Sequence, residues 1–214
     1  GNFIGDKIGS IKEFSYIEYI IPGLIIIPII TNSYMNVVGS FYSGRFQKST
    51  EELLVSPVPN WIILVGYVSG GVLRAFIVGF AVYLVTIFFI DIPIHNLPFV
   101  LFITLLTAFL FSIAGFINAA YAKSFDDINI VPTFVLNPLT YLGGTFYSIE
   151  SLPEIWQDIS LFNPIAYIVS VFRYGFLGLE ESSIYLSLTI IIVFIVILFK
   201  IGLIMLEKGI GIKN

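Results

Sequence analysis

Residues 61–90 read WIILVGYVSGGVLRAFIVGFAVYLVTIFFI, and only one residue of this run, Arg74, carries a charge. A helix that crosses the hydrocarbon core of a bilayer needs roughly 20 consecutive, mostly apolar residues, so the run is long enough to span a membrane. The whole chain has the same character: it is 57% hydrophobic and 11% charged, whereas soluble domains carry about 25% charged residues. The sequence therefore predicts an integral membrane protein.

Five stretches meet the length requirement for a membrane span, and each is apolar around its whole circumference, as expected of a helix between lipid and other helices. The predicted spans are 16–38, 66–90, 98–121, 128–148 and 183–206. Prolines 22, 28 and 132 fall inside them, which membrane helices tolerate when neighbours satisfy the freed carbonyls. We therefore predict an all-α, polytopic helical bundle. Asp126 and Asp127 are predicted to cap the start of the fourth span.

The lysines and arginines favour one orientation of this bundle, because these residues are enriched in cytoplasmic loops. With five spans, one side of the membrane holds 1–15, 91–97 and 149–182, and the other holds 39–65, 122–127 and 207–214. The first side has Lys7, Lys12 and Arg173, and the second has Arg45, Lys48, Lys123, Lys208 and Lys213, with Arg74 and Lys200 inside spans but nearer to it. The second side, with the C-terminus, is predicted to be cytoplasmic.

The stretch FQKSTEELLVSPVP, residues 46–59, is polar and lies between two apolar runs. Ser49 and Glu52 have the spacing of a capping box, which satisfies two free backbone donors at a helix start. The apolar residues 53–55 follow, and Pro57 ends the turn. Two interpretations remain open: a tight loop that reverses the chain, or a short helix that offers an apolar patch to a partner.

Residues 136–178, LNPLTYLGGTFYSIESLPEIWQDISLFNPIAYIVSVFRYGFLG, predict two short helices. Ser151 and Glu154 again have capping-box spacing, with Pro153 in the first turn. Asn163 and Pro164 break this helix and start a second one, which Gly178 ends and which is too short to span a membrane. We expect a re-entrant or interfacial hairpin on the extracellular side; a surface loop folded on itself is the alternative.

The same region resembles the C-terminal signature of the ABC-2 type transporter permease family, and residues 46–59 are similar to the cytoplasmic coupling segment of that family. The elements of the resemblance are Gly143-Gly144, Phe146, Leu152-Pro153, Asn163-Pro164, Tyr167, Arg173 and Gly178. It implies one transmembrane domain over residues 1–214. The family has six spans after an interfacial helix, so we expect that helix and the first span to be absent from these 214 residues.

The resemblance also implies a function. Members are permease subunits of ATP-binding cassette exporters of the bacterial inner membrane, and pair with a second permease copy and a cytoplasmic ATP-binding subunit. The short helix would then be the coupling helix that docks on that subunit, and its residues are Ser49, Glu51, Glu52, Leu53 and Leu54. The extracellular hairpin would gate the route of an amphiphilic substrate. The residues of this gate are Gly143, Gly144, Pro153, Asn163, Pro164, Tyr167 and Arg173. The sequence has no G-x-x-x-x-G-K-[ST] phosphate loop, so ATP and magnesium are expected on the partner subunit.

Arg74 is a charge inside a predicted span, and such a charge is a functional candidate by default. Because we place it near the cytoplasmic end of span 66–90, a side chain that reaches back to the lipid headgroups is the alternative. The chain has no cysteine and one histidine, His95, which is expected in a surface loop, so no metal site is predicted. An ion-coupled secondary transporter, a membrane-embedded enzyme and a structural scaffold are the rival classes.

Overall fold

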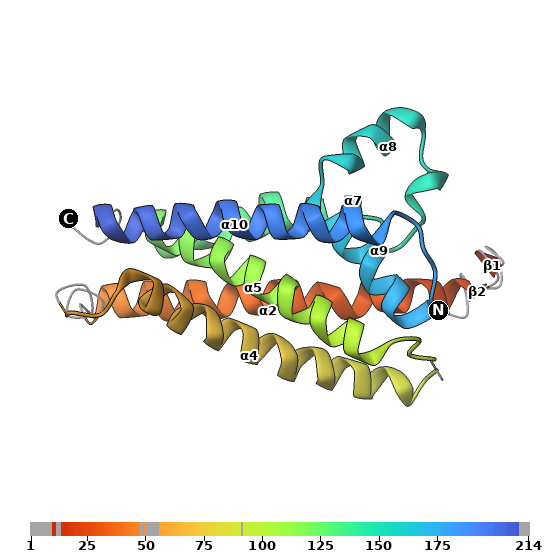
Figure 1. The fold of residues 1–214 in the computed structure, drawn as a ribbon, viewed down its shortest axis with the longest axis horizontal. Coiled ribbons are helices and arrows are strands. Elements are labelled where there is room, and N and C mark those ends of the chain that lie inside the picture. Colours follow the sequence, from red (N-terminus) through yellow and green to blue (C-terminus); the bar gives the residue numbers. More distant parts are fainter. Residues whose placement is uncertain (1–9, 12–13, 48, 50–55, 91, 210–214) are drawn as a thin grey trace.

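The computed structural model of the protein describes residues 10–11, 14–47, 49, 56–90 and 92–209, and shows an elongated bundle of helices (Figure 1). Two strands, β1 (Ser10–Ile11) and β2 (Phe14–Ser15), pair antiparallel before the first long helix. The helices are α2 (Tyr16–Phe46), α4 (Asn60–Ile87), α5 (Leu97–Tyr121), α6 (Phe125–Val131), the π-helix η1 (Pro132–Leu136), α7 (Asn137–Leu142), the 3-10 helix η2 (Ile149–Ser151), α8 (Glu154–Leu161), α9 (Pro164–Leu177) and α10 (Ile184–Lys208).

The helices α2, α4, α5 and α10 run along the long axis of the molecule, and α2 packs against α4, α5 and α9 (Figure 1). At one end of the bundle α8 projects away from the other helices, and we call this the hairpin end. Helix α10 finishes at the opposite end, which we call the C-terminal end. The all-α, polytopic architecture that the composition predicts is confirmed.

In the described part of the chain, four helices are long and apolar enough to cross a membrane: α2, α4, α5 and α10. Two of their boundaries differ from the predicted spans by more than three residues. Helix α2 continues to Phe46, because Arg45 donates hydrogen bonds to the carbonyls of Ala119, Ala120 and Ala122 at the end of α5 and so holds the last turn of α2 against it. Helix α4 begins at Asn60 rather than at 66, since Pro59 supplies the extended residue before an apolar first turn.

The fourth predicted span, 128–148, is a continuous run of α6, η1 and α7 over residues 125–142. Ser124 is its N-cap, and the Asp127 carboxylate accepts from the Lys123 and Ser124 amides, so the predicted capping role of Asp127 is confirmed. Pro132 has no N–H to donate to the carbonyl of Ile128. The Asn118 side chain of α5 donates to that carbonyl at 3.0 Å instead, as the interior of a membrane requires.

A close contact of the bundle lies where α2, α4 and α5 meet. A Cβ atom added to Gly71 of α4 would overlap the Ser112 hydroxyl of α5 and lie 2.8 Å from the Ser33 carbonyl of α2. Ser112 also donates a hydrogen bond to this carbonyl, at 3.4 Å. Only a residue without a side chain allows the three backbones to approach so closely.

We predict that Gly71→Ala destabilises the protein by about 1–3 kcal/mol, because the added methyl group overpacks this contact. Gly66→Ala on the same helix is the matched control, since a Cβ there meets nothing within 4 Å. The thermal midpoint of the purified protein in detergent should fall for the first variant and stay near that of the parent for the second. Equal midpoints for the two variants would contradict the prediction, because they would show that the close approach of the three helices adds nothing to the free energy of unfolding.

Candidate functional site

Arg173 is the centre of the hairpin end. Its side chain is 1% exposed, although it carries a charge. The guanidinium Nη1 forms an ion pair with the carboxylate of Glu181, Nη2 donates to the Gly144 carbonyl at 2.8 Å, and Nε donates to the Tyr19 carbonyl at 3.3 Å. The guanidinium carbon also lies 3.9 Å from the centre of the Tyr19 ring, within reach of a cation–π interaction. A single side chain thus connects α2, α9 and two loops.

Tyr19 and Glu181 complete this cluster. The Tyr19 hydroxyl donates a hydrogen bond to the Glu181 carboxylate, which therefore has partners on both of its oxygens. Gly144 can offer its carbonyl to Arg173 because its backbone turns with φ +74°, a conformation that costs glycine little. Sequence reasoning singled out Arg173 and Gly144 but missed Glu181. The only available signal was the acidic pair Glu180-Glu181 on the same predicted side of the membrane.

Asn163 and Tyr167 fix the second half of the hairpin. The Asn163 side chain caps α9 by accepting from the Ile165 amide at 3.0 Å and donates to the Leu139 carbonyl of α7 at 2.6 Å. The Tyr167 hydroxyl donates to the Leu161 carbonyl of α8 at 2.8 Å. The predicted helix break at Asn163-Pro164 is confirmed, and α9 ends at Gly178 as predicted, with a left-handed backbone.

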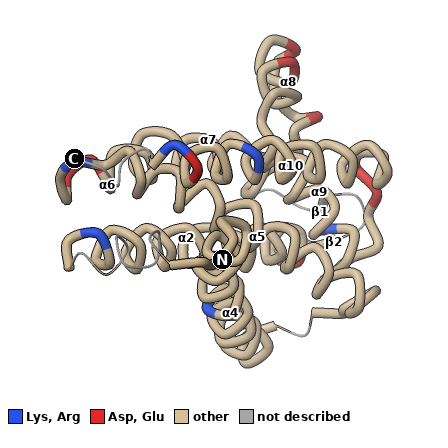
Figure 2. Tube along the Cα trace, turned by 60° about the vertical axis from the view of Figure 1, so that its left-hand side comes forward, with Lys and Arg blue, Asp and Glu red and all other residues tan. Residues whose placement is uncertain are grey.

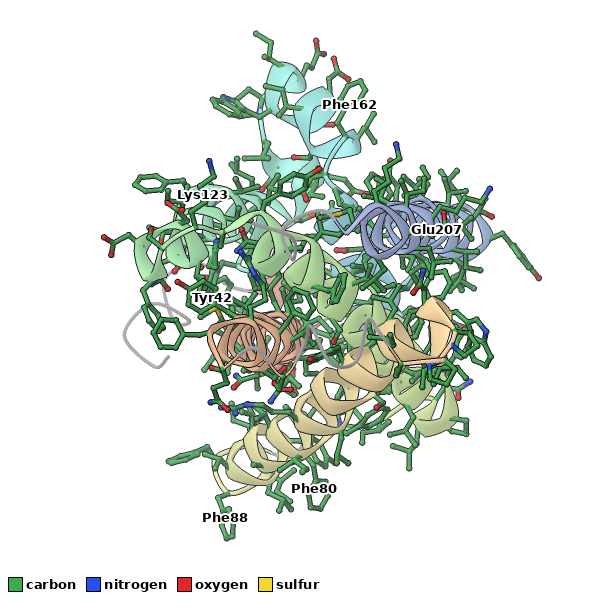
Figure 3. The ribbon with its side chains drawn as sticks, turned by 90° about the vertical axis from the view of Figure 1, so that its left-hand side faces the viewer. Tyr42, Phe80, Phe88, Lys123, Phe162 and Glu207 are labelled. Atoms are coloured by element: carbon green, nitrogen blue, oxygen red, sulfur yellow. The ribbon has the colours of Figure 1, made fainter. Side chains whose placement is uncertain are left out.

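The two hairpin helices differ in how they are packed. They meet at an angle of 90°, and α9 is buried along almost its whole length, whereas the apolar side chains of α8 face outward. Ile155 is 73% exposed and Phe162, after the end of α8, is 87% exposed; Figure 3 shows Phe162 on this projection. An exposed apolar face beside a polar one on the same helix is typical of a helix that lies in a membrane interface.

The predicted capping box of α8 is wrong. Ser151 lies in η2 and donates its hydroxyl hydrogen to the Ser148 carbonyl at 2.6 Å. Pro153 is the N-cap, one residue outside the helix rather than in its first turn, so Glu154 occupies the first position instead of the third. The Gln157 side chain ties down the helix start by donating to the Leu152 carbonyl at 2.7 Å.

Arg74 lies apart from the hairpin, in the middle of α4 and not near its cytoplasmic end as predicted. The reason is the earlier start of α4, which puts Arg74 about 20 Å from either end of the helix at 1.5 Å per residue. Its Nε donates to the Asn32 side-chain oxygen, at 3.3 Å, in the middle of α2. An arginine at this depth costs about 2.5–3.5 kcal/mol if it faces lipid, and it cannot reach the headgroups as easily as a residue at a helix end.

Of the predicted coupling residues, which follow α2 in the sequence, the structure describes Ser49. Ser49 is exposed and donates its hydroxyl hydrogen to the Gly44 carbonyl at 3.1 Å. Glu51, Glu52, Leu53 and Leu54 lie outside the described residues, so the short helix predicted there stays a prediction. Of the predicted gate residues, the structure gathers Gly143, Gly144, Asn163, Pro164, Tyr167 and Arg173 at the hairpin end, while Pro153 lies farther out beside α8.

Charge is distributed unequally between the two ends (Figure 2). At the hairpin end the described acidic residues are Glu18, Glu150, Glu154, Asp158, Glu180 and Glu181, against one cation, the buried Arg173. The C-terminal end has Arg45, Lys123 and Lys208 with Asp126, Asp127 and Glu207. Over the described residues, no three histidine, aspartate or glutamate side chains gather as a metal site would need, and His95 is exposed in the loop before α5.

A comparison with known families identifies this arrangement. The model of the family described as ABC-2 type transporter matches residues 3–177, which include α2, α4, α5 and both hairpin helices. The chain belongs to the ABC-2 type transporter family. The resemblance inferred from the spaced glycines, Asn163-Pro164 and Arg173 is thereby confirmed.

Curated relatives cover nearly the whole chain. "Inner membrane transport permease YadH" of Escherichia coli K12 is 48% identical over 214 residues, which are 100% of this chain and 84% of that protein. "Nodulation protein J" of Rhizobium leguminosarum bv. viciae is 22% identical over 209 residues, 97% of this chain and 81% of that protein. No solved structure matches the chain.

We predict that Arg173→Gln and Glu181→Gln each destabilise the protein by about 3–5 kcal/mol. The Glu181 variant leaves the buried Arg173 without its counter-charge, and the Arg173 variant does the same to the partly buried Glu181. Tyr19→Phe removes one hydroxyl and should cost about 1 kcal/mol. Glu180→Gln is the matched control, since Glu180 is the exposed neighbour of Glu181 and should change stability by less than about 0.5 kcal/mol. Thermal unfolding in detergent measures all four, and a Glu181 variant as stable as the Glu180 variant would contradict the cluster.

Proposed function

We propose that this protein is the permease subunit of an ATP-binding cassette exporter of the bacterial inner membrane, and that it moves an amphiphilic substrate outward. The family match over residues 3–177 carries this proposal. The 48% identity to an inner membrane transport permease supports it, and so do the four helices long enough to span a membrane. ATP and magnesium are held by a separate cytoplasmic subunit, and two permease copies enclose the route.

The C-terminal end faces the cytoplasm in this proposal and the hairpin end faces outward. Arg45, Lys123 and Lys208 at the C-terminal end support this orientation, because lysine and arginine are enriched on the cytoplasmic side. The one described cation of the hairpin end, Arg173, is buried and paired with Glu181, so it adds no free positive charge to that side.

Cysteine labelling tests the orientation, and the chain has no cysteine of its own. Glu154→Cys at the hairpin end and Glu207→Cys at the C-terminal end are both exposed positions. In intact cells whose outer membrane is permeable, a membrane-impermeant maleimide should label the first variant and not the second. In inverted inner-membrane vesicles the pattern should reverse. Labelling of Glu207→Cys in the intact cells would refute the orientation.

Coupling to the ATP-binding subunit is assigned to the segment that begins at Ser49 and includes Glu51, Glu52, Leu53 and Leu54. The described residues on both sides of it belong to α2 and α4, so a force applied there acts on two helices of the tightly packed α2–α4–α5 core. Nucleotide-driven closure of the partner would thereby shift an equilibrium between two packings of the bundle. The hairpin at the opposite end, held by Arg173, Asn163 and Tyr167, would act as the outer gate.

We predict that Leu53→Asp combined with Leu54→Asp abolishes co-purification of the ATP-binding subunit. Each leucine should contribute roughly 1.5–3 kcal/mol if it is buried in the partner, and a charge in an apolar groove is costly to desolvate. Leu53→Ala with Leu54→Ala should give an intermediate loss. Co-purification and substrate-coupled ATPase activity are the readouts, at equal permease levels in the membrane.

The control places the same two charges elsewhere, as Ile155→Asp with Ile159→Asp on the exposed face of α8. This variant should retain the ATP-binding subunit, because α8 lies at the other end of the bundle. If the leucine-to-aspartate variant retains the subunit as well, residues 49–55 are only a loop that reverses the chain.

A further inference from the structure

One outward face of the bundle carries polar side chains from the middle of α2 and α4 toward the C-terminal end. On α2, Asn32, Asn36, Ser40 and Ser43 follow one another at helical spacing, and none of them is buried. Arg74 of α4 lies beside them, bonded to Asn32. We call these five residues the Arg74 strip.

The space in front of this strip is open. A Cβ atom added to Gly39 of α2 or Gly66 of α4 would meet nothing within 4 Å, and one added to Gly70 would touch only the Asn36 side chain, at 3.4 Å. Around and beyond Arg74, the outward surface of α4 carries large apolar side chains, with Leu73 64%, Ile77 60% and Phe80 63% exposed. Figure 3 shows Phe80 pointing away from the bundle, as a lipid-facing residue would. The strip therefore differs in chemistry from its surroundings on the same helix.

The hydrogen bond to Asn32 orients the Arg74 guanidinium and leaves most of its donors available for an anion. The Asn32 amide nitrogen donates to the Pro28 carbonyl at 3.0 Å, which orients the amide oxygen toward Arg74. Asn32 is the one hydrogen-bond partner of Arg74 among the residues that the structure describes, and it occupies only Nε. The other guanidinium nitrogens form a planar fork that suits a phosphate or carboxylate.

No described acidic residue can supply that anion. Glu18, Glu150, Glu154, Asp158, Glu180 and Glu181 lie at the hairpin end, and Asp126, Asp127 and Glu207 lie at the C-terminal end. The phosphates of resident lipids lie at the bilayer surfaces, about 15 Å from the midplane, whereas Arg74 is in the middle of α4. An anionic group that reaches this depth has to travel through the membrane.

We propose that the Arg74 strip lines the transport route and that Arg74 binds the phosphate or carboxylate group of the transported molecule, which is therefore an anionic amphiphile. This inference rests on the proposed transport function and names its substrate class. The polar side chains of α2 form a hydrated route for the charged group of the substrate. The apolar part of the substrate stays in contact with the neighbouring hydrophobic surface.

The accessibility of the strip can be measured in the complete permease, reconstituted with its ATP-binding subunit in phosphatidylcholine vesicles. Asn36→Cys places a thiol in the strip, and Leu73→Cys places one on the apolar face of the same bundle at a similar depth. Two thiosulfonate reagents are compared, the anionic sulfonatoethyl and the cationic trimethylammonium-ethyl compound. Asn36→Cys should react, faster with the anion, and Leu73→Cys should react with neither.

The charge of Arg74 is then varied in the Asn36→Cys background. Arg74→Gln should remove the preference for the anionic reagent, a change of about tenfold in the ratio of rates, and Arg74→Lys should keep it. Dodecyl phosphate should protect the thiol from labelling when Arg74 is present, with about tenfold weaker apparent affinity in Arg74→Gln, as expected for a lost charged hydrogen bond. The uncharged dodecanol should give equal protection in both.

Three outcomes would overturn the inference. An unreactive Asn36→Cys, with or without ATP, would mean that another helix covers the strip. A charge preference that Arg74→Gln leaves unchanged, or equal protection by dodecyl phosphate in both backgrounds, would mean that Arg74 does not bind the anion. Failure of the proposed function looks different, because the permease would then neither retain the ATP-binding subunit nor change its ATPase rate, whatever the labelling shows.

Discussion

The hairpin end depends on the burial of one positive charge. Removing a guanidinium from water costs several kcal/mol, which only a counter-charge and well-placed acceptors can offset. Arg173 obtains the counter-charge from Glu181 and the acceptors from Gly144 and Tyr19. Because these partners come from α2, from the turn after α7 and from the segment after α9, the need to neutralise one side chain determines how three separate parts of the chain meet.

Arg74 has the opposite arrangement. It lies on the outside of α4, with a neutral amide as its partner, where Arg173 lies inside with a carboxylate. Among the residues that the structure describes, Arg173 therefore has a carboxylate as counter-charge and Arg74 does not. Under the proposed function, Arg173 is a structural charge and Arg74 is a charge that binds a group from outside the chain. Burial distinguishes the two better than position in the sequence does.

Composition predicts the long helices well, because a bilayer demands uninterrupted apolar runs that few other patterns provide. The break at Asn163-Pro164 and the end at Gly178 were also predictable, since both depend on local backbone chemistry. The pairing of Arg173 with Glu181 and of Arg74 with Asn32 depends on distances across the bundle, which no local pattern encodes. The start of α4 was placed too late because 60–65 was read as loop, and this error moved Arg74 toward the membrane surface.

The π-helix η1 also determines how the faces of the fourth hydrophobic segment follow one another. An α-helix advances by 100° per residue, and a π turn contains an extra residue, so α7 is rotated by about 100° relative to the continuation of α6. Side chains before Pro132 and after Leu136 that share a stripe on a regular helical wheel therefore contact different neighbours. The two halves of the segment, α6 and α7, therefore need separate helical wheels. Only then can substitutions along the segment be sorted into lipid-facing and bundle-facing positions.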